Sequence, residues 1–435
     1  MSSISLKNSS IPAFIALLAG CGSSAVAPGE PAPVKLASDV VFEAWDVKLA
    51  GRGEAGLDVR RPAVIAAVAD SKSDVLCLNE VWRKADRDAI GAAGKTRFPH
   101  QATFDAALDT TPSDAHDQDG KVPTPPTSAP CDSVPSKLAV DRALSCAMKN
   151  CSTVPGSDEG YLTDYKCAQA SCISELVAIQ AASTRCYNCV GVGTNDGKYA
   201  DVKKECESNP KGGYAFGGDN GVLLLSRLPI SKVETRVMPS TNFRRTVVHA
   251  SLKADDGSDV DVYCTNFSEI FLGLVAPYSG LYGRGHTDDK GWAAEQQLQE
   301  KQLVDYVKAS AASGRAVVLG NFNASTEWSD GKDIVVSANA GEPTINALDA
   351  ALTPGVVAGY KPSCTLCSDN AWMTPKVSAQ GSDPVWTSRI YLQGIDKRAV
   401  HESKLTHTDA VIEWSGMHMP ASPHYGFSSA ISLAK

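Results

Sequence analysis

The sequence has no surplus of basic residues and no long hydrophobic run. Its 41 lysines and arginines are outnumbered by 49 aspartates and glutamates, which gives a formal net charge of −8. A protein that binds nucleic acid without reading its sequence needs a basic footprint, so this balance disfavours nucleic acid as a partner. The apolar run at residues 11–18 is too short to span a bilayer as a mature helix, and no other segment is long and apolar enough.

The beginning of the chain predicts export. Lys7 precedes the apolar run at residues 11–18, and the run leads into the tetrapeptide Leu-Ala-Gly-Cys that ends at Cys21. A basic residue followed by a short apolar stretch predicts a signal peptide over residues 1–20. The tetrapeptide resembles the lipobox of bacterial lipoproteins, which implies cleavage before Cys21 and lipidation of its thiol. The alternative is an ordinary signal peptide with a chance cysteine.

Residues 21–38 are rich in glycine, alanine, serine and proline, and we expect them to form a flexible tether. Together the two segments predict a protein that is exported and lipid-anchored to the bacterial cell envelope, at the outer membrane or the cell surface. The membrane would then be a partner through the N-terminal lipid anchor.

Cysteine is abundant, with 13 residues. An exported chain can oxidise them, so disulfides are expected. Eight cysteines lie between residues 131 and 206, and Cys364 and Cys367 form a separate local pair. Cys77 and Cys264 lie inside apolar, strand-like runs, and we expect them to be buried thiols that behave as small hydrophobic side chains.

From residue 40 the sequence alternates between strand-like and helix-like segments. Short apolar runs predict strands at residues 40–47, 74–81, 221–226, 247–252, 260–266, 316–321, 387–392 and 408–414. Helical spacing of apolar residues occurs at residues 61–69 and 292–312. The chain has 435 residues, of which 43% are hydrophobic, so it can build a full core in one large or two ordinary domains.

The alternation stops between residues 105 and 213. A polar, proline-rich stretch leads into the window of eight cysteines, whose apolar content is thin. Because crosslinks can substitute for a core, residues 126–209 are predicted to form an inserted, mostly helical module held by its own disulfides.

Two helical segments in this window, residues 137–150 and 163–182, are expected to pair as an antiparallel hairpin. Each carries or borders two cysteines, and the favoured disulfides join Cys146 and Cys151 to Cys167 and Cys172. A zinc site is the alternative, because two closely spaced cysteine pairs would supply four thiolates. Those pairs are Cys186 with Cys189 and Cys364 with Cys367.

Short polar motifs occur at the ends of several predicted strands. The predicted strand at residues 316–321 leads into Gly-Asn-Phe-Asn, residues 320–323, and the strand at residues 74–81 ends in Asn-Glu-Val. These segments resemble signatures of the endonuclease/exonuclease/phosphatase family, and five such segments occur in the family's order. The resemblance covers about residues 39–105 and 213–430, with a pattern similar to the sphingomyelinase-type and nuclease-type branches.

The resemblance implies a four-layer α/β sandwich, in which two mixed β-sheets are flanked by helices and the site lies at the mouth of the sandwich. It assigns residues 39–125 and 210–435 to this domain and leaves residues 126–209 as a disulfide-rich helical insertion. It also implies a metal-dependent phosphoester (phosphodiester) hydrolase with Mg²⁺ or Mn²⁺ as its cofactor. Glu80 stands where the family has a magnesium-binding glutamate, and Asp46 would supply a second oxygen ligand.

The resemblance also assigns the reacting groups. Asn321 stands at the water-activating position, Asn323 at a position that contacts phosphate, and His424 at one that stabilises charge. Asn266 occupies the place of a phosphate-contacting histidine. Arg245 lies just before a predicted strand and is a candidate for binding the substrate phosphate.

Five positions depart from the family pattern: Asp46, Asn266, Asn321, Ser388 and Pro423. An amide at position 321 cannot accept a proton as the family's aspartate does, and Pro423 removes the carboxylate beside His424. The expected activity is therefore impaired at its catalytic base. The alternatives are a non-catalytic pseudoenzyme or binding module on the same fold, and a structural role in which the insertion contacts partners. The substrate stays open among lipids, phosphoinositides, nucleotides and nucleic acids.

Overall fold

The computed structural model describes residues 39–51, 54–112, 123–124, 126–163, 165–271, 276–374 and 383–433. The predicted signal peptide (1–20), the tether (21–38) and the predicted lipidation site at Cys21 lie outside these residues. In the described part of the chain, no helix is both long enough and apolar enough to cross a bilayer.

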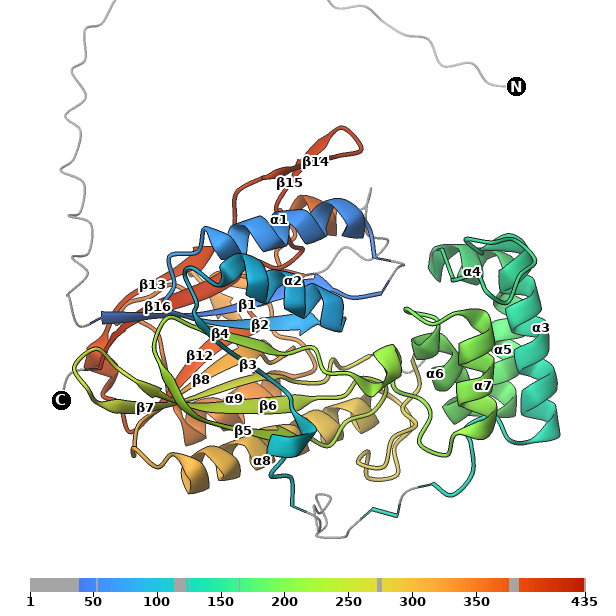
Figure 1. Ribbon diagram of the computed structural model, residues 1–435, viewed down its shortest axis with the longest axis horizontal. Helices are drawn as coiled ribbons and strands as arrows, with labels where there is room; N and C mark the ends of the chain where they lie inside the picture. The colour runs from blue at the N-terminus through green and yellow to red at the C-terminus, as the bar shows by residue number, and fades with distance from the viewer. Residues whose placement is uncertain are drawn as a thin grey trace, which may run out of the picture. The chain divides into compact units, whose positions relative to one another are not determined.

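Two six-stranded mixed sheets form the centre of the fold (Figure 1). The first has the order β13-β16-β1-β2-β4-β3, with β13 at Val400–Thr406, β16 at Gly426–Ser432, β1 at Asp39–Leu49, β2 at Val75–Val81, β4 at Leu223–Ser226 and β3 at His100–Thr103. The second has the order β11-β12-β8-β7-β6-β5, with β11 at Thr353–Pro354, β12 at Ser388–Gln393, β8 at Ala316–Asn321, β7 at Asp259–Asn266, β6 at Thr246–Lys253 and β5 at Ile230–Val237. Two small hairpins complete the strands: β9 (Trp328–Ser329) with β10 (Ile334–Val336), and β14 (Ile412–Trp414) with β15 (Met417–Met419).

Each large sheet has one parallel pair at its centre, β1 with β2 and β7 with β8, and its other neighbours are antiparallel. Parallel strands need a crossover connection, and a helix supplies it in both cases. Helix α1 (Leu57–Ala69) joins β1 to β2, and α8 (Asp289–Ser310) joins β7 to β8. Helices α1 and α2 (Lys84–Gly94) cover the first sheet, and α8 and α9 (Glu342–Ala351) cover the second (Figure 1). The predicted four-layer sandwich is confirmed.

The alternation of side chains along each strand builds separate cores. In β1, Phe42 and Ala44 join the core between the two sheets, whereas Trp45 and Val47 join the core under α1 and α2. Successive residues of a strand point to opposite faces, so a strand that is buried on both faces is apolar at nearly every position. This explains why most of the central strands were visible in the sequence as continuous apolar runs.

The strand predicted at residues 408–414 is wrong in its position. Strand β14 covers only Ile412–Trp414, and the strand that joins the first sheet is β13, at Val400–Thr406. Most residues of β13 are half-buried, because this strand lies at the edge of the sheet. Its mixed composition therefore gave no apolar run to detect.

The cysteine-rich window forms helices α3 (Val134–Asn150), α4 (Tyr165–Ser171), α5 (Ile173–Ala182), α6 (Thr184–Gly193) and α7 (Tyr199–Ser208). Four disulfides crosslink it: Cys146–Cys172, Cys151–Cys167, Cys131–Cys186 and Cys189–Cys206. The first two confirm the pairing predicted between the helical segments. The alternative zinc site is wrong, because its four cysteines are all oxidised: Cys186 and Cys189 in these bonds, and Cys364 and Cys367 with each other.

Asp261, near the beginning of β7, forms hydrogen bonds with β6 and with the loop before β8. It is 1% exposed and accepts hydrogen bonds from Ser251 Oγ (2.7 Å), Ser313 N (3.0 Å) and Ser313 Oγ (2.8 Å), and it lies 2.9 Å from His249 Nε2. Burial alone would raise the pKa of Asp261, but the hydrogen bonds from His249 and these serine groups outweigh it and hold the pKa well below its usual range.

We expect Asp261→Asn to lower the free energy of unfolding by about 2–4 kcal/mol at pH 7, because it disrupts a buried network. A carboxylate with a lowered pKa stabilises the fold above its unfolded pKa of about 3.9, and this stabilisation is lost as the pH falls toward the folded pKa. The difference between the wild type and the variant should therefore shrink below about pH 4. Urea unfolding at pH 7 and pH 3, at constant ionic strength, measures it. An equal difference at both pH values would contradict the assignment.

Candidate functional site

Polar residues continue the inward-facing rows of four strands at one end of the sandwich. In β1, Phe42 and Ala44 face the core between the sheets, and Asp46 is the next residue of the same row. The same two-residue step leads from Cys77, Cys264 and Leu319, all in that core, to Asn79, Asn266 and Asn321. The strand pairing places Asp46 opposite Asn79 and Asn266 opposite Asn321. The apolar core between the sheets therefore ends in a polar layer.

Residues that begin antiparallel strands reach the same end. Arg245 precedes β6, Ser388 begins β12 opposite Asn321, and His424 lies just before β16. An antiparallel neighbour begins where its partner ends, so these three residues come back to the polar layer from the opposite chain direction. The site is thus assembled from both sheets.

Hydrogen bonds connect four of the predicted site residues in one chain. Asn321 Nδ2 donates to the Asp46 carboxylate and to Asn323 Oδ1, the latter at 3.1 Å. Asn323 Nδ2 donates to Phe267 O at 2.8 Å and lies 3.4 Å from Asn266 Oδ1. The amide oxygen of Asn321 accepts from the backbone N–H of Asn323 at 3.0 Å. The amide nitrogen of Asn321 is therefore the atom that faces Asp46.

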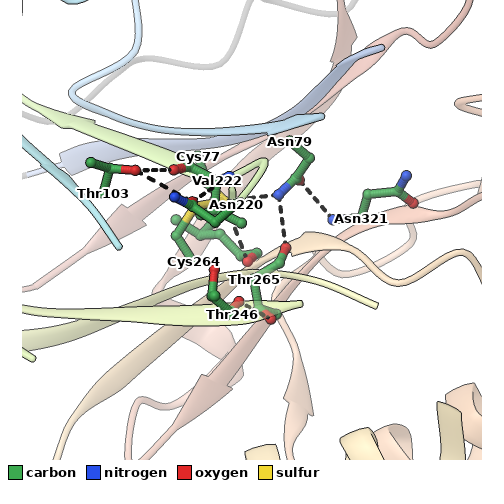
Figure 2. Close-up of a disulfide and its surroundings, with 10 residues drawn as sticks. Cys77, Asn79, Thr103, Asn220, Val222, Thr246, Cys264, Thr265 and Asn321 are labelled. Carbon is green, nitrogen blue, oxygen red and sulfur yellow. Dashed lines mark hydrogen bonds between the residues drawn. A yellow bond between two sulfur atoms is a disulfide. The ribbon is translucent and has the colours of Figure 1, made fainter. Parts of the chain in front are cut away.

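Asn79, which sequence reasoning missed, joins the two sheets beneath this chain (Figure 2). Its side-chain oxygen accepts from Asn321 N at 2.8 Å, and its side-chain nitrogen donates to Thr265 O at 2.8 Å. Two residues earlier on the same strands, Cys77 and Cys264 form a disulfide between the sheets. Both cysteines are fully buried, as expected, but the expectation that they are unpaired is wrong. The crosslink and the amide together fix the separation of the strand ends that carry the site.

The backbone is strained at this end of the sandwich. Lys48, Glu80 and Asn323 have φ values of 45°, 59° and 50°, in the left-handed region that costs energy for residues with a Cβ. Lys48 lies where the pairing of β1 with β2 shifts register, and Glu80 lies near the end of β2. Strained residues of this kind concentrate at functional sites, where the surrounding structure holds them in place.

Opposite charges gather around Glu80. Burial, with repulsion from Asp46 and Glu269, raises the pKa of Glu80 to about 8, although Arg245 and Lys48 act in the other direction. Glu54, and then Glu269, Glu80 and Asp46, raise the pKa of the Lys48 ammonium. Sequence reasoning missed Lys48, Glu54 and Glu269. A basic residue two positions after Asp46 and an acid three positions after Asn266 were the available signals.

Arg245 is a buried cation with donors to spare. Its side chain is 3% exposed and lies over the rings of Trp82 and Phe243, at 5.4 and 5.6 Å from their centroids. Among the described residues, its Nε and Nη1 atoms have no hydrogen-bond partner. Burial lowers the pKa of Arg245. A buried guanidinium with unused N–H groups is suited to binding an anion.

His424 lies beside the polar layer, but few hydrogen bonds hold its imidazole ring in place. Burial lowers its pKa to about 4, so the ring is neutral at pH 7. Its Nδ1 atom finds no partner within the described part of the protein. The carbonyl of Pro423 instead accepts a hydrogen bond from Asn370 Nδ2 at 2.9 Å. Proline at position 423 thus leaves the imidazole without an anionic neighbour at Nδ1.

The donor groups fit a hard divalent cation. Asp46 and Glu80 lie close enough for Asp46 to raise the pKa of Glu80, and side-chain amide oxygens surround them. Mg²⁺ is commonly held by one or two carboxylates, with water and substrate oxygens as its other ligands. In the described ranges, one group of three closely spaced metal-binding side chains occurs elsewhere: Cys364, Cys367 and Asp369. Its two cysteines form a disulfide, so thiolate ligands are not available there.

A cavity of about 820 Å³ joins these residues to the insertion. Glu80, Arg245 and Lys48 contribute to its polar lining, and Glu54 and Glu269 add further charge. The insertion is fixed to the sandwich nearby, since Asn188 Nδ2 donates to Pro277 O at 2.7 Å. A second contact is the ion pair between Arg83 and Asp196, at 2.6 Å. The charged groups therefore line a partly open cavity of ligand size.

Comparison with known proteins identifies the family. The family model described as the Endonuclease/Exonuclease/phosphatase family matches residues 51–391. Among curated proteins, none matches the chain. Solved structures with a similar fold include sphingomyelinase C from Streptomyces griseocarneus, with 15% identity over 90% of this chain and 99% of that one and a TM-score of 0.46. Another is a mutant beta toxin from Staphylococcus aureus with bound magnesium ions, with 13% identity over 91% and 99% of the two chains and a TM-score of 0.46. A third is an endonuclease/exonuclease/phosphatase from Beutenbergia cavernae, with 13% identity over 91% and 72% and a TM-score of 0.43. The chain belongs to the endonuclease/exonuclease/phosphatase family, whose members are phosphoester hydrolases.

Proposed function

We propose that this protein is a metal-dependent phosphodiester hydrolase whose catalytic carboxylate has moved from position 321 to position 46. The proposal rests on one contact above all, the hydrogen bond from Asn321 Nδ2 to the Asp46 carboxylate. In the family pattern, position 321 holds an aspartate and position 46 an asparagine. Here the two residue types are exchanged across that hydrogen bond. The pair therefore keeps one carboxylate and one amide, a few ångströms from where the pattern places them.

This exchange changes the interpretation of the substituted site. Asparagine at position 321, taken alone, removes the general base that the family pattern places there. The Asp46 carboxylate lies next to that position and could act as the base instead. Asp46 is 1% exposed, and its second oxygen accepts from Lys48 N at 2.9 Å, so the carboxylate is held in one orientation. A buried, fixed carboxylate is a suitable acceptor for the proton of an attacking water.

The roles of the other site residues follow from the metal ligands and hydrogen-bond donors that their side chains provide. Glu80 would hold Mg²⁺ or Mn²⁺ and leave Asp46 to act as the base; when bound, the ion supplies a Lewis acid that polarises the phosphate ester. Arg245 has N–H groups available for the phosphate oxygens. The side-chain nitrogen of Asn266, which also has no hydrogen-bond partner among the described residues, is a further donor. Asn323 orients Asn266. His424, neutral at pH 7, would donate a hydrogen bond rather than a positive charge.

In the proposed reaction, water oxygen bonds to phosphorus, one P–O ester bond breaks, and the leaving oxygen takes up a proton. Asp46 accepts the proton that the water loses. The products are a phosphomonoester and an alcohol. The charge of the bound phosphate is balanced by Arg245 and Lys48, two cations that the site already contains.

We further propose that the protein is exported and anchored to the bacterial cell envelope through Cys21. Six disulfides within the described residues support an oxidising compartment. The lipobox-like sequence before Cys21 supports the anchor. Globomycin-sensitive processing and labelling with a fatty-acid analogue, both lost in Cys21→Ser, would test the anchor.

Hydrolysis of bis(p-nitrophenyl) phosphate tests the proposed function. We expect turnover with Mg²⁺ or Mn²⁺ and none after treatment with EDTA. Glu80→Gln should weaken Mn²⁺ binding, measured by titration calorimetry, by at least about tenfold, because it removes a charged ligand. Glu413→Gln, an exposed carboxylate in β14, is the control and should behave as the wild type. Mn²⁺ binding without turnover of any phosphodiester would instead favour the binding-module alternative.

A further inference from the structure

An apolar chamber, meaning the part of the site's cavity that the cysteine-rich insertion lines, lies beside the candidate active site. It is part of the cavity of about 820 Å³ whose polar lining includes Glu80 and Arg245. The insertion supplies most of the apolar lining, through Leu144, Ala147, Leu162, Ala168, Ile179 and Val190. Pockets for small ligands usually measure about 300–1,000 Å³. One cavity therefore combines charged groups from the sandwich with an apolar wall from the insertion.

The chamber is built from the residues that would otherwise form the insertion's solid core. The six apolar residues just named are at most 8% exposed, and all belong to the hydrophobic cluster of the insertion. Protein interiors normally pack without voids larger than a water molecule, and unfilled apolar volume is destabilising. A cavity of this size between the insertion and the sandwich is thus not a packing defect.

Disulfides supply the stability that a hollow core lacks. Two of them hold α3 against α4 and the start of α5, and two more hold α6 to α7 and to the segment before α3. Of these helices, α3, α4, α5 and α6 contribute side chains to the chamber lining. Crosslinks keep the walls apart at fixed positions without requiring side chains to fill the space between them.

We propose that the insertion binds the apolar chain of an amphipathic phosphodiester whose phosphate lies at Arg245. This inference rests on the proposed function and names its substrate class. Two independent observations carry it: the buried guanidinium of Arg245 has donors without a partner among the described residues, and the apolar chamber belongs to the same cavity. An anion with a single hydrocarbon chain satisfies both, because its charged and apolar parts match the two linings.

A series of alkyl p-nitrophenyl phosphates, from methyl to dodecyl and below their micelle concentrations, tests the proposal. With Mg²⁺, we expect KM to fall about 3- to 4-fold for each added methylene, which corresponds to about 0.8 kcal/mol, until the chamber is filled. The value of kcat should change little, because the chain does not touch the reacting atoms. A KM that is independent of chain length would overturn the proposal.

Filling the chamber provides the matched test. Ala147→Trp places a large ring in the chamber wall, and it should raise the ratio of KM for the dodecyl ester to KM for the methyl ester at least tenfold. Leu138→Trp, on the exposed face of the same helix, is the control. A free-thiol content equal to that of the wild type in both variants shows that the disulfides have formed. Equal KM values for Ala147→Trp and the wild type on both esters would contradict the assignment.

Binding without turnover separates this inference from the proposed function. Dodecyl methyl phosphate in EDTA, followed by titration calorimetry, should bind the wild type at least tenfold more tightly than Ala147→Trp. If it does so while no ester is hydrolysed under any metal condition, the hydrolase proposal fails and the chamber stands. If the methyl ester is hydrolysed but dodecyl methyl phosphate does not bind, the chamber fails and the hydrolase proposal stands.

Discussion

The double variant Asp46→Asn with Asn321→Asp should recover most of the activity that either single change removes. Asp46 and Asn321 face each other across one hydrogen bond, so exchanging them keeps one carboxylate, one amide and the hydrogen bond between them. The donor and the acceptor change places, and the number of charges stays the same. The recovered enzyme would also have the residue types that the family pattern places at these positions.

The single variants fail for different reasons. Asp46→Asn leaves two facing amides and no base, and should lower kcat by about 10²–10⁴-fold, the usual contribution of a positioned general base. Asn321→Asp places two carboxylates at hydrogen-bonding distance in a buried site, where like charges repel. It should lower activity and also lower the free energy of unfolding at pH 7.

The comparison is a double-mutant cycle measured with bis(p-nitrophenyl) phosphate and saturating Mg²⁺. We expect a coupling energy of several kcal/mol between the two positions, because residues that act as a unit are strongly non-additive. A double variant with the product of the two single losses would show that Asp46 and Asn321 act independently. An Asp46→Asn variant with unchanged kcat would remove Asp46 from the mechanism. Thermal unfolding of all four proteins controls for stability.

The sequence was informative where a strand is buried on both faces. Strand β8 is apolar throughout and ends in Asn321, so both its existence and its site end could be predicted. Strand β16 was missed, because it carries three serines among its seven residues although nearly all of them are buried. Its serine hydroxyls find partners in other segments; Ser429 Oγ, for example, donates to Gly355 O. Such partners are set by tertiary packing and leave no periodic signal.

The site was predictable as a set of strand ends, and its internal contacts were not. Asp46 and Asn321 are far apart in the chain, and only the packing of one sheet on the other brings their side chains together. Their exchange therefore looked like two separate losses. The Cys77–Cys264 crosslink was missed for the same reason, since its two cysteines are 187 positions apart in the sequence. The strained Lys48 depends on a register shift that the sequence does not encode locally.

The apolar chamber could be predicted from the sequence even less than the site contacts. The insertion's cysteines indicated crosslinks, and two of the disulfides join the helical segments that were expected to pair as an antiparallel hairpin. However, the same apolar residues would line a solid core or a hollow one, and only the arrangement of α3, α4, α5 and α6 decides which. The thin apolar content of this window, which first indicated a crosslinked module, is also what a hollow core requires.

Replacing Arg245 should lower the activity of the protein without lowering its stability. Arg245→Met keeps an unbranched apolar stem but removes every donor, and should lower kcat/KM for phosphodiesters by about 10²–10³-fold, as removal of a fixed anion-binding donor does elsewhere. The variant should be at least as stable as the wild type. Burial lowers the pKa of Arg245, which means that the folded protein disfavours the charged form despite the nearby acids. Methionine avoids the cost of burying that charge, and Glu80, whose pKa is raised to about 8, can take up a proton instead of remaining an unpaired anion.

The neighbouring Arg244 supplies the matched control. It is half-buried, lies over the ring of Phe104 at 5.8 Å, and is not part of the cavity lining. Arg244→Met should leave kcat/KM within about threefold of the wild type, the range of a surface charge. Steady-state kinetics and thermal unfolding of both variants measure the two quantities. A buried arginine that weakens the fold and yet is required for turnover is retained for the anion it binds. Equal kinetic losses in the two variants would instead assign the effect to general electrostatics, and a destabilised Arg245→Met would assign Arg245 to the fold.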